Sequence, residues 1–164
     1  MCSSDLSNPI ADVLTATASV LQNGYVRPNR GVMGWEVMRI LKVNSITTDR
    51  IKYVERAIVT PEIMASLFDL DTLLVGDSSR NTAAEGATAS NSFIWGKDML
   101  VYYAPDRASL RNPSAGYLLQ IGQKMKTKRW REEKRSADAI EVSTMFVPRA
   151  VATSAAYLIK QAVI

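Results

Sequence analysis

The chain has 164 residues, of which 47% are apolar, and its 20 Lys and Arg against 16 Asp and Glu give a net charge of +4. This apolar fraction excludes wholesale disorder, and the length supports one domain or a large part of one. The sequence has no histidine and a single cysteine, Cys2. These counts exclude Ser-His and Cys-His nucleophile pairs, histidine general bases, histidine or multi-thiolate zinc sites and an internal disulfide.

Residues 1–8 have neither the basic start nor the apolar stretch of a signal peptide, so we expect them to be a loose leader. No apolar run approaches the roughly 18–20 residues that a membrane helix needs. With its single cysteine, the chain suits a reducing compartment.

The first expected element is a helix at about 9–22. Asn8 and Pro9 are typical of a helix N-cap and first position, and Asn23-Gly24 is typical of a helix end where a residue takes positive φ. Between these ends, residues recur at helical spacing and only Thr17 is polar: Ile10, Val13, Leu14, Thr17, Ala18 and Leu21.

Shorter elements are expected next: a loop at 26–29, a strand at 32–33, a helix at 35–43, and an exposed loop with a short extended piece at 46–58. Thr60 then begins the clearest local signal, because it can cap a helix that opens with Pro61 and Glu62. This helix should bury Ile63, Met64, Leu67 and Phe68, and residues 72–75 should form a buried strand.

Residues 77–92 are rich in Ser, Thr, Ala, Asn and Gly without an apolar period, so we expect a loop of unusual length there. A strand should follow at 93–104, interrupted by a turn at Gly96-Lys97-Asp98, then a loop at 105–113 and a strand at 115–122. Gly76-Asp77-Ser78-Ser79 follows a strand, as phosphate-binding loops do. However, the chain has neither a P-loop nor a GxGxxG pattern, so phosphate binding is disfavoured.

The last third of the chain differs in charge and in period. Residues 124–135 hold seven Lys and Arg against two Glu, so the rest of the chain sums to −1. From Ile140 to Phe146 apolar and polar residues alternate, which predicts an extended ribbon that Pro148 breaks or places at an edge. Residues 151–164 are apolar and could form either a strand or a helix.

Two groups of charged residues are candidate functional sites. Asp69, Asp71 and Asp77 could serve hydrolysis or bind Mg²⁺, although capping of a helix and a strand explains them more simply. The basic strip around Trp130 could bind nucleic acid, contact another subunit, or be a solvated strand. Its charged residues are Lys124, Lys126, Lys128, Arg129, Arg131, Glu132, Glu133, Lys134 and Arg135.

Several segments, in this order, resemble the major capsid proteins of tailed phages, which have the Hong Kong 97-type fold. The segments are RIKY (50–53), VTPEIMASLF (59–68), LLVG (73–76), NTA (81–83), WGKD (95–98), YAP (103–105), PSAGY (113–117) and RWREEK (129–134). No single segment is diagnostic, and their shared order is what carries the resemblance.

The resemblance implies an α+β fold that covers only the C-terminal half of such a subunit, without the N-terminal arm, extended loop and spine helix. It implies a peripheral-domain helix at 9–23, an axial domain at 24–123, and peripheral-domain return strands with a tail at 124–164. A chain lacking the spine helix and N-terminal arm is not expected to close into shells by itself.

The resemblance also implies a structural protein without catalytic residues, cofactor or metal. Copies would assemble through pentamers and hexamers into an icosahedral shell around double-stranded DNA, in the host cytoplasm and then in the virion. The loops at 77–92 (with Asp77, Arg80 and Asn81) and 105–113 become candidate subunit contacts, and the basic strip a candidate subunit-facing or DNA-facing surface. Two alternatives remain: an encapsulin-like shell protein, and a small carboxylate-dependent hydrolase or binding domain.

Overall fold

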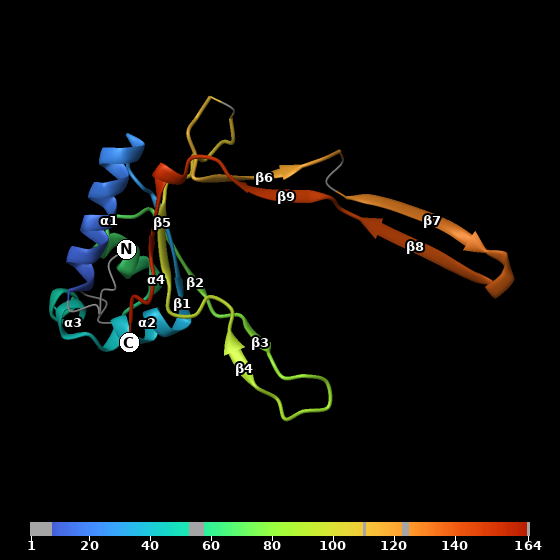
Figure 1. Cartoon of the computed structure of the whole chain (residues 1–164), viewed down its shortest axis with the longest axis horizontal. Coiled ribbons are helices and arrows are strands. Elements are labelled where there is room, and N and C mark those ends of the chain that lie inside the picture. Colours follow the sequence, from blue (N-terminus) through green and yellow to red (C-terminus); the bar gives the residue numbers. More distant parts are fainter. Residues whose placement is uncertain (1–7, 53–57, 110, 123–124, 164) are drawn as a thin grey trace.

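The computed structural model describes residues 8–52, 58–109, 111–122 and 125–163. Figure 1 shows helices gathered on one side of a small sheet, with two β-hairpin structures that project away on the other side. The chain is therefore α+β, as expected. No helix within the described ranges is long and apolar enough to cross a membrane.

The first helix, α1 (Pro9–Gly24), starts as predicted, with Ala11 N–H donating to the Asn8 side chain at 3.2 Å. Its end differs from the prediction, because the residue with positive φ is Tyr25 at 56° and not Gly24. Gly24 instead allows a close approach, since a Cβ atom there would lie 2.7 Å from the Ser154 carbonyl oxygen.

The buried face of α1 is only partly the one predicted. Leu14 and Leu21 expose 54% and 44% of their surface, whereas Ala16 and Val20 are buried together with Ile10 and Val13. The small Ala16 side chain lets α1 lie close to strands of the sheet. The face of α1 that contacts the sheet is therefore rotated about the helix axis from the face that the larger apolar side chains predicted.

The prediction of a loop over 46–58 is wrong for its first part. Helix α2 (Trp35–Val43), which was predicted, is followed at once by α3 (Ser45–Ile51), and residues 53–57 lie outside the described ranges. The Asn44 side chain caps α3 by accepting from Ile46 N–H at 3.0 Å, and Thr47 and Ile51 are buried. Burial and this cap outweigh the weak helix propensity of a Thr-rich segment.

Helix α4 (Pro61–Leu67) confirms the signal that begins at Thr60. Ile63 N–H donates to the Thr60 hydroxyl at 3.4 Å, and Pro61 occupies the first turn. Met64 and Phe68 are fully buried.

Four strands form the central sheet in the order β10 (Ala156–Ile159), β5 (Met99–Tyr102), β1 (Arg30–Gly34) and β2 (Thr72–Gly76). The pair β1–β2 is parallel and the other two pairs are antiparallel. The predicted strands at 32–33 and after the Gly96 turn are thus confirmed. The strand at 72–75 exists, but the prediction that it is buried is wrong, since β2 is an edge strand in which Leu73 is buried and Leu74 is exposed. The C-terminal segment contributes a strand after a short 3-10 helix, η2 (Thr153–Ala155).

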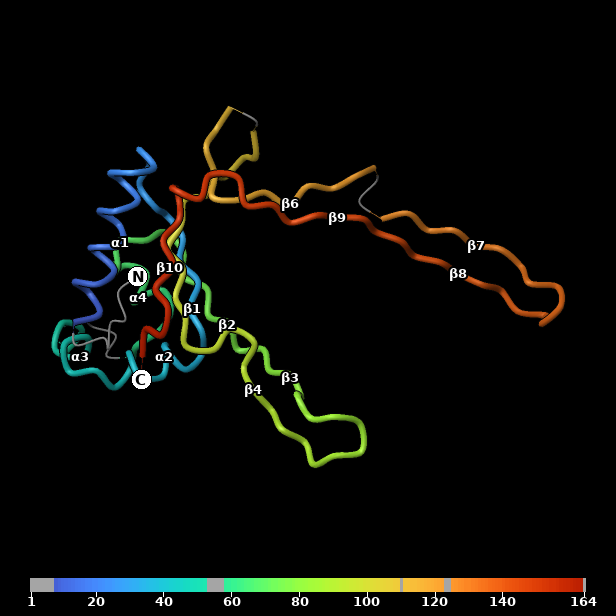
Figure 2. The backbone as a smooth tube through the Cα atoms, viewed as in Figure 1, coloured from blue at the N-terminus to red at the C-terminus, as the bar shows by residue number. Residues whose placement is uncertain are grey.

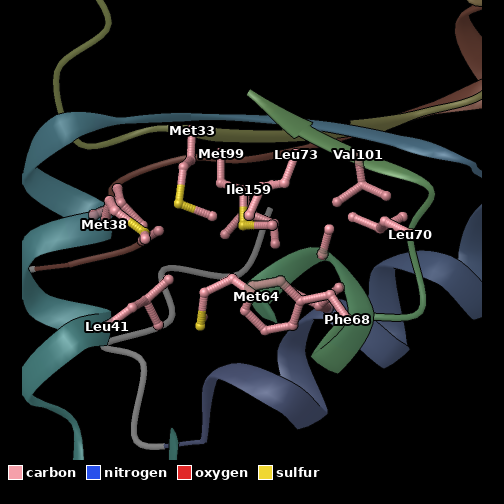
Figure 3. Close-up of a cluster of buried hydrophobic side chains, with 14 of the residues drawn as sticks. Met33, Met38, Leu41, Met64, Phe68, Leu70, Leu73, Met99, Val101 and Ile159 are labelled. Carbon is pink, nitrogen blue, oxygen red and sulfur yellow. The ribbon is translucent and has the colours of Figure 1, made fainter. Parts of the chain in front are cut away.

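The hydrophobic core fills the space between one face of this sheet and the helices. Figure 3 shows Met33, Met99 and Val101 pointing from the sheet toward Met64 and Phe68. Residues of α1 (Ile10, Val13, Ala16) and of the C-terminus (Ile159, Ala162, Val163) belong to the same cluster. The body of the protein therefore has a single core to which both ends of the described chain contribute.

The expected long loop at 77–92 contains a hairpin, so its prediction as wholly irregular is wrong. Strands β3 (Ser79–Asn81) and β4 (Asn91–Phe93) pair antiparallel. The Asn81 carboxamide oxygen accepts from the backbone N–H groups of Ala83 and Ser90, both at 3.0 Å, which closes the hairpin loop. Hydrogen bonds between a side chain and the backbone therefore order this segment, which has no alternating apolar residues.

A second and longer projection, which we call the arm, comprises residues 115–151. Strand β6 (Gly116–Gln120) pairs with β9 (Phe146–Ala150), and farther out β7 (Lys126–Glu132) pairs with β8 (Ala137–Ser143) around the 3-10 turn η1 (Glu133–Arg135). Figure 2 traces both ribbons leading away from the body. The predicted ribbon exists, but it is broken at 144–145 between β8 and β9.

Candidate assembly interface

The arm buries none of its described side chains. Within the described part of residues 115–151 every residue is exposed or half-buried. Large apolar side chains there expose 45–66% of their surface, namely Leu118, Leu119, Ile121, Met125, Trp130, Ile140, Val142, Met145, Phe146, Val147 and Val151. Contiguous apolar surface of this kind marks interaction sites in soluble proteins.

Both faces of the inner ribbon, β6–β9, are apolar. In its antiparallel register Leu118 lies opposite Pro148 on one face, and Leu119 lies opposite Val147 on the other. A two-stranded ribbon is marginally stable in water, and solvated ribbons normally keep one polar face. The inner ribbon therefore has the composition of a strand pair that further protein surface covers.

The root of the arm is joined to the body by a backbone hydrogen bond, which Ala115 N–H donates to the Tyr103 carbonyl at 3.0 Å. The two ends of the arm are held together there, since Val151 N–H donates to the Ala115 carbonyl at 3.0 Å. The Tyr117 hydroxyl lies 2.9 Å and 2.8 Å from the carbonyl oxygens of Ser109 and Asn112, so the loop after β5 is bound to the first strand of the arm. The loop predicted at 105–113 thus supports the arm root.

The outer ribbon carries the predicted basic strip. Lys126, Lys128, Arg129, Arg131 and Glu132 are on β7, and Glu133, Lys134 and Arg135 form η1. Lys124 lies outside the described residues. The structure thus brings the described members of the strip together at the far end of the arm, as Figure 1 shows for β7.

Carboxylates compensate part of the strip's positive charge, and one of them, Asp138, was not among its predicted residues. Arg129 and Arg131 both approach Asp138 across the hairpin, at 2.8 Å and 3.7 Å, and Arg131 also lies 3.8 Å from Glu133. Arg135 is 4.0 Å from Glu132. The sequence analysis did not include Asp138 in the strip, because only the strand register shows which residues face it. An acidic residue in the strand that follows a basic strand is the sequence feature that could have indicated this pairing.

Strand alternation separates the cations onto two faces. Lys126, Lys128 and Trp130 point to one face, where Glu141 lies opposite Lys128, while Arg129 and Arg131 share the other face with Asp138. The arm therefore has an apolar inner ribbon and a charged outer ribbon.

The second predicted contact region is the β3–β4 hairpin. Asp77 and Arg80 are exposed at its base and in its first strand. Asn81 is also exposed, but its carboxamide oxygen is engaged by the hairpin backbone. Asp77 and Arg80 remain predicted contact residues, whereas Asn81 has a structural role that its position in the sequence did not indicate.

The three carboxylates considered for catalysis do not form one site. Asp69, which pairs with Arg27, and Asp71 both line an open hollow of about 410 Å³, and Asp71 also borders one of about 610 Å³ beside α4, whereas Asp77 lines neither. Asp71 and Asp77 lie at opposite ends of β2, about 20 Å apart at the usual rise of a strand. Within the described ranges no group of three or more Cys, Asp or Glu is placed to hold a metal ion.

Comparisons with known proteins give one distant relative in sequence. No protein-family model matches the chain. The major capsid protein of Burkholderia phage BcepMu is 26% identical over 119 residues, which is 70% of this chain and 38% of that protein. The chain is a distant homologue of a phage major capsid protein.

A solved structure supports the same relationship for the fold. The crystal structure of a phage-related protein from Bordetella bronchiseptica RB50 matches with a TM-score of 0.85 and 26% identity, over 98% of this chain and 53% of that one. This capsid-related chain therefore spans only about half, or less, of the proteins that it matches. The predicted relationship to a phage major capsid protein is thus confirmed as a distant homology.

Proposed function

We propose that the chain is part of a structural subunit of a bacteriophage capsid and that it acts by self-association. The observation that carries this proposal is its homology to the BcepMu major capsid protein, together with a fold match that covers 98% of the chain. The α+β body with a projecting ribbon is compatible with the Hong Kong 97-type fold. On this proposal residues 24–123 would correspond to the axial domain, and residues 9–23 and 124–164 to parts of the peripheral domain.

The role proposed is mechanical and not catalytic. Copies of the subunit would form the pentamers and hexamers of an icosahedral shell around double-stranded DNA, assembled in the host cytoplasm. The arm is the proposed contact element, because its large apolar side chains are exposed and its root is hydrogen-bonded to the body. A two-stranded ribbon gains stability when another surface covers its apolar side chains, which favours association.

Removal of the arm tests this proposal. Gly116 and Ala150 are paired at the arm root, so residues 117–149 can be replaced by Asn-Gly, a sequence that favours the tight turn of a two-residue hairpin. The body should stay folded, because none of the core residues lies in the arm. Its thermal unfolding should therefore remain cooperative.

The expected result is that the parent chain sediments as oligomers at micromolar concentration, whereas the arm-deleted chain sediments as a monomer. Negative-stain electron microscopy should show no closed shells of the parent chain, since it spans only part of its relatives. A parent chain that stays monomeric, or an arm-deleted chain that associates as well as the parent, would contradict the proposal.

A further inference from the structure

The sheet has a second face, which the helices do not cover. In the registers of the four strands Leu74, Val32, Leu100 and Leu158 lie side by side, one from each strand, on the face opposite the core. Leu74 and Leu158 expose 53% and 46% of their surface, and Val32 and Leu100 are half-buried. We call this row the apolar stripe.

Polar and aromatic groups border the stripe on two sides. At one border, the Trp95 ring packs on Gly76 and the Gly96 carbonyl lies on Gly34. Both contacts are so close that a Cβ atom on either glycine would collide with these groups. At the other border, Arg30 is paired with Asp106 at 3.4 Å. Between these borders, the stripe is uncovered by the part of the chain that the structure describes.

The arm of the same molecule does not cover the stripe. Its root is held by the backbone bonds from Ala115 N–H to the Tyr103 carbonyl and from Ala152 N–H to the Ser114 carbonyl, and the two ribbons lead away from the sheet (Figure 2). The arm and the stripe are thus two apolar surfaces of one chain that do not cover each other. The stripe is therefore open to an occupant from outside the described residues.

Geometry and charge both favour the arm of a second copy as that occupant. An apolar sheet face is normally covered by another β layer about 10 Å away, and the inner ribbon of the arm is such a layer with apolar faces. The whole net charge of +4 resides in the arm, with eight Lys and Arg against four Asp and Glu, and the remaining residues hold twelve of each. Contact between two arms would place two positive elements together, whereas contact between an arm and a body would not.

An acidic residue beside the stripe adds to this preference. Asp106, which pairs with Arg30 at the border of the stripe, exposes 94% of its side chain. On the arm, Arg149 is an exposed cation within the apolar inner ribbon. The Asp106 carboxylate offers a partner to this cation at the rim of the stripe.

We propose that the inner ribbon β6–β9 of one copy packs on the apolar stripe of the next copy. This inference rests on the proposed self-association and specifies the two surfaces that carry it. The contact is heterologous, because the donor surface and the acceptor surface differ. Repetition of a heterologous contact generates a ring when the rotation closes and an open chain when it does not.

A mixing experiment with two complementary variants tests the contact. Leu74→Glu with Leu158→Glu destroys the stripe and keeps the arm, whereas the arm-deleted chain keeps the stripe. Both leucines are exposed positions on the two edge strands, so the folded body should tolerate the change. Leu14→Glu with Leu21→Glu is the matched control, since these leucines have similar exposure on the helix side of the body.

Each variant alone should sediment as a monomer, an equimolar mixture should form a complex of one chain of each kind, and the control should associate like the parent. A stripe variant that associates like the parent overturns the inference and leaves the proposed self-association intact. Self-association of the stripe variant alone, as expected for contact between two arms, or of the arm-deleted chain alone, as expected for contact between two stripes, also overturns it. A mixture that stays monomeric overturns it too. A monomeric parent chain overturns the proposed function as well.

Circular dichroism and thermal unfolding show whether the stripe variant is folded. If the glutamates unfold the sheet, Leu74→Ser with Leu158→Thr removes the same apolar surface with less disturbance. This milder variant should give the same results in the mixing experiment, and its association constant with itself should be at least tenfold lower than that of the parent chain.

Discussion

Arg129 and Asp138 lie diagonally across the outer ribbon of the arm, with Arg129 Nη2 donating to Asp138 Oδ2 at 2.8 Å. Arg131 approaches the same carboxylate from the other side at 3.7 Å. One acidic side chain thus holds two cations of the basic strip on a single face. These side chains are 42–69% exposed, so the pairs orient the arginines and add little stability.

Reversal of both arginine charges should block assembly without unfolding the subunit. Arg129→Glu with Arg131→Glu, in the full-length capsid subunit, would place three carboxylates on this face and remove the positive charge offered to a neighbour. Electron microscopy should then show no particles, while circular dichroism of the subunit stays unchanged. Arg50→Glu, an exposed change on α3, is the control that should still give particles. Normal particles from the double variant would contradict the prediction.

The core predicts a large difference between two apolar truncations. Phe68 is 2% exposed and packs against Met64, so Phe68→Ala should cost about 3–5 kcal/mol of unfolding free energy through lost burial and the cavity it leaves. Leu14→Ala, at a site that is 54% exposed, should cost less than about 1 kcal/mol. Urea unfolding measures both, and equal costs would mean that the assigned core is wrong.

Features that depend on a few neighbouring residues could be predicted from the sequence. The caps at Asn8 and Thr60 work through the next three residues, and both helices begin where those caps stand. The buried face of α1 was harder to assign, because the larger Leu14 outweighed Ala16 in the sequence pattern and the sheet selects the smaller side chain. Helix α3 was missed because its stability comes from burial of Thr47 and Ile51 in the folded chain and not from helix propensity.

The functional surfaces depend on strand register, which local sequence does not specify. The basic strip was recognised, but its compensation by Asp138 follows only from the β7–β8 pairing. The apolar stripe joins Leu74 and Leu158 through two intervening strands, and no sequence period connects residues so far apart. Register and edge positions are set by tertiary packing, so these surfaces required the structure.

The fold should not tolerate the addition of a methyl group at Gly34. A Cβ atom at Gly34 would collide with the Gly96 carbonyl, which lies on the connection between the β3–β4 hairpin and β5. Gly34 N–H also donates to the Asp98 carbonyl at 3.2 Å, so the connection cannot move away without losing this bond. Gly34→Ala should therefore lower the unfolding free energy by about 1–3 kcal/mol or more.

Gly86 provides the control for this change. It has φ of 83°, but no heavy atom lies within 4 Å of a Cβ built there. Gly86→Ala should cost only the backbone strain of about 1–2 kcal/mol, within the hairpin loop. Thermal unfolding should then show the larger decrease for Gly34→Ala, and the reverse order would contradict the close approach at Gly34.

The lysines of the arm predict a measurable salt dependence if this surface meets packaged DNA. Within the described residues, Lys126, Lys128 and Lys134 have no acidic group within 4.0 Å, unlike Arg129, Arg131 and Arg135. Each phosphate contact adds about 0.9 to the slope of log affinity against log salt, so replacing all three lysines by Gln should reduce that slope by about 2–3. Fluorescence anisotropy with duplex DNA measures the slope. The matched control replaces the exposed body residues Lys52, Lys97 and Lys160 by Gln. Equal slopes for the two triple variants would show that the arm faces other subunits and not DNA.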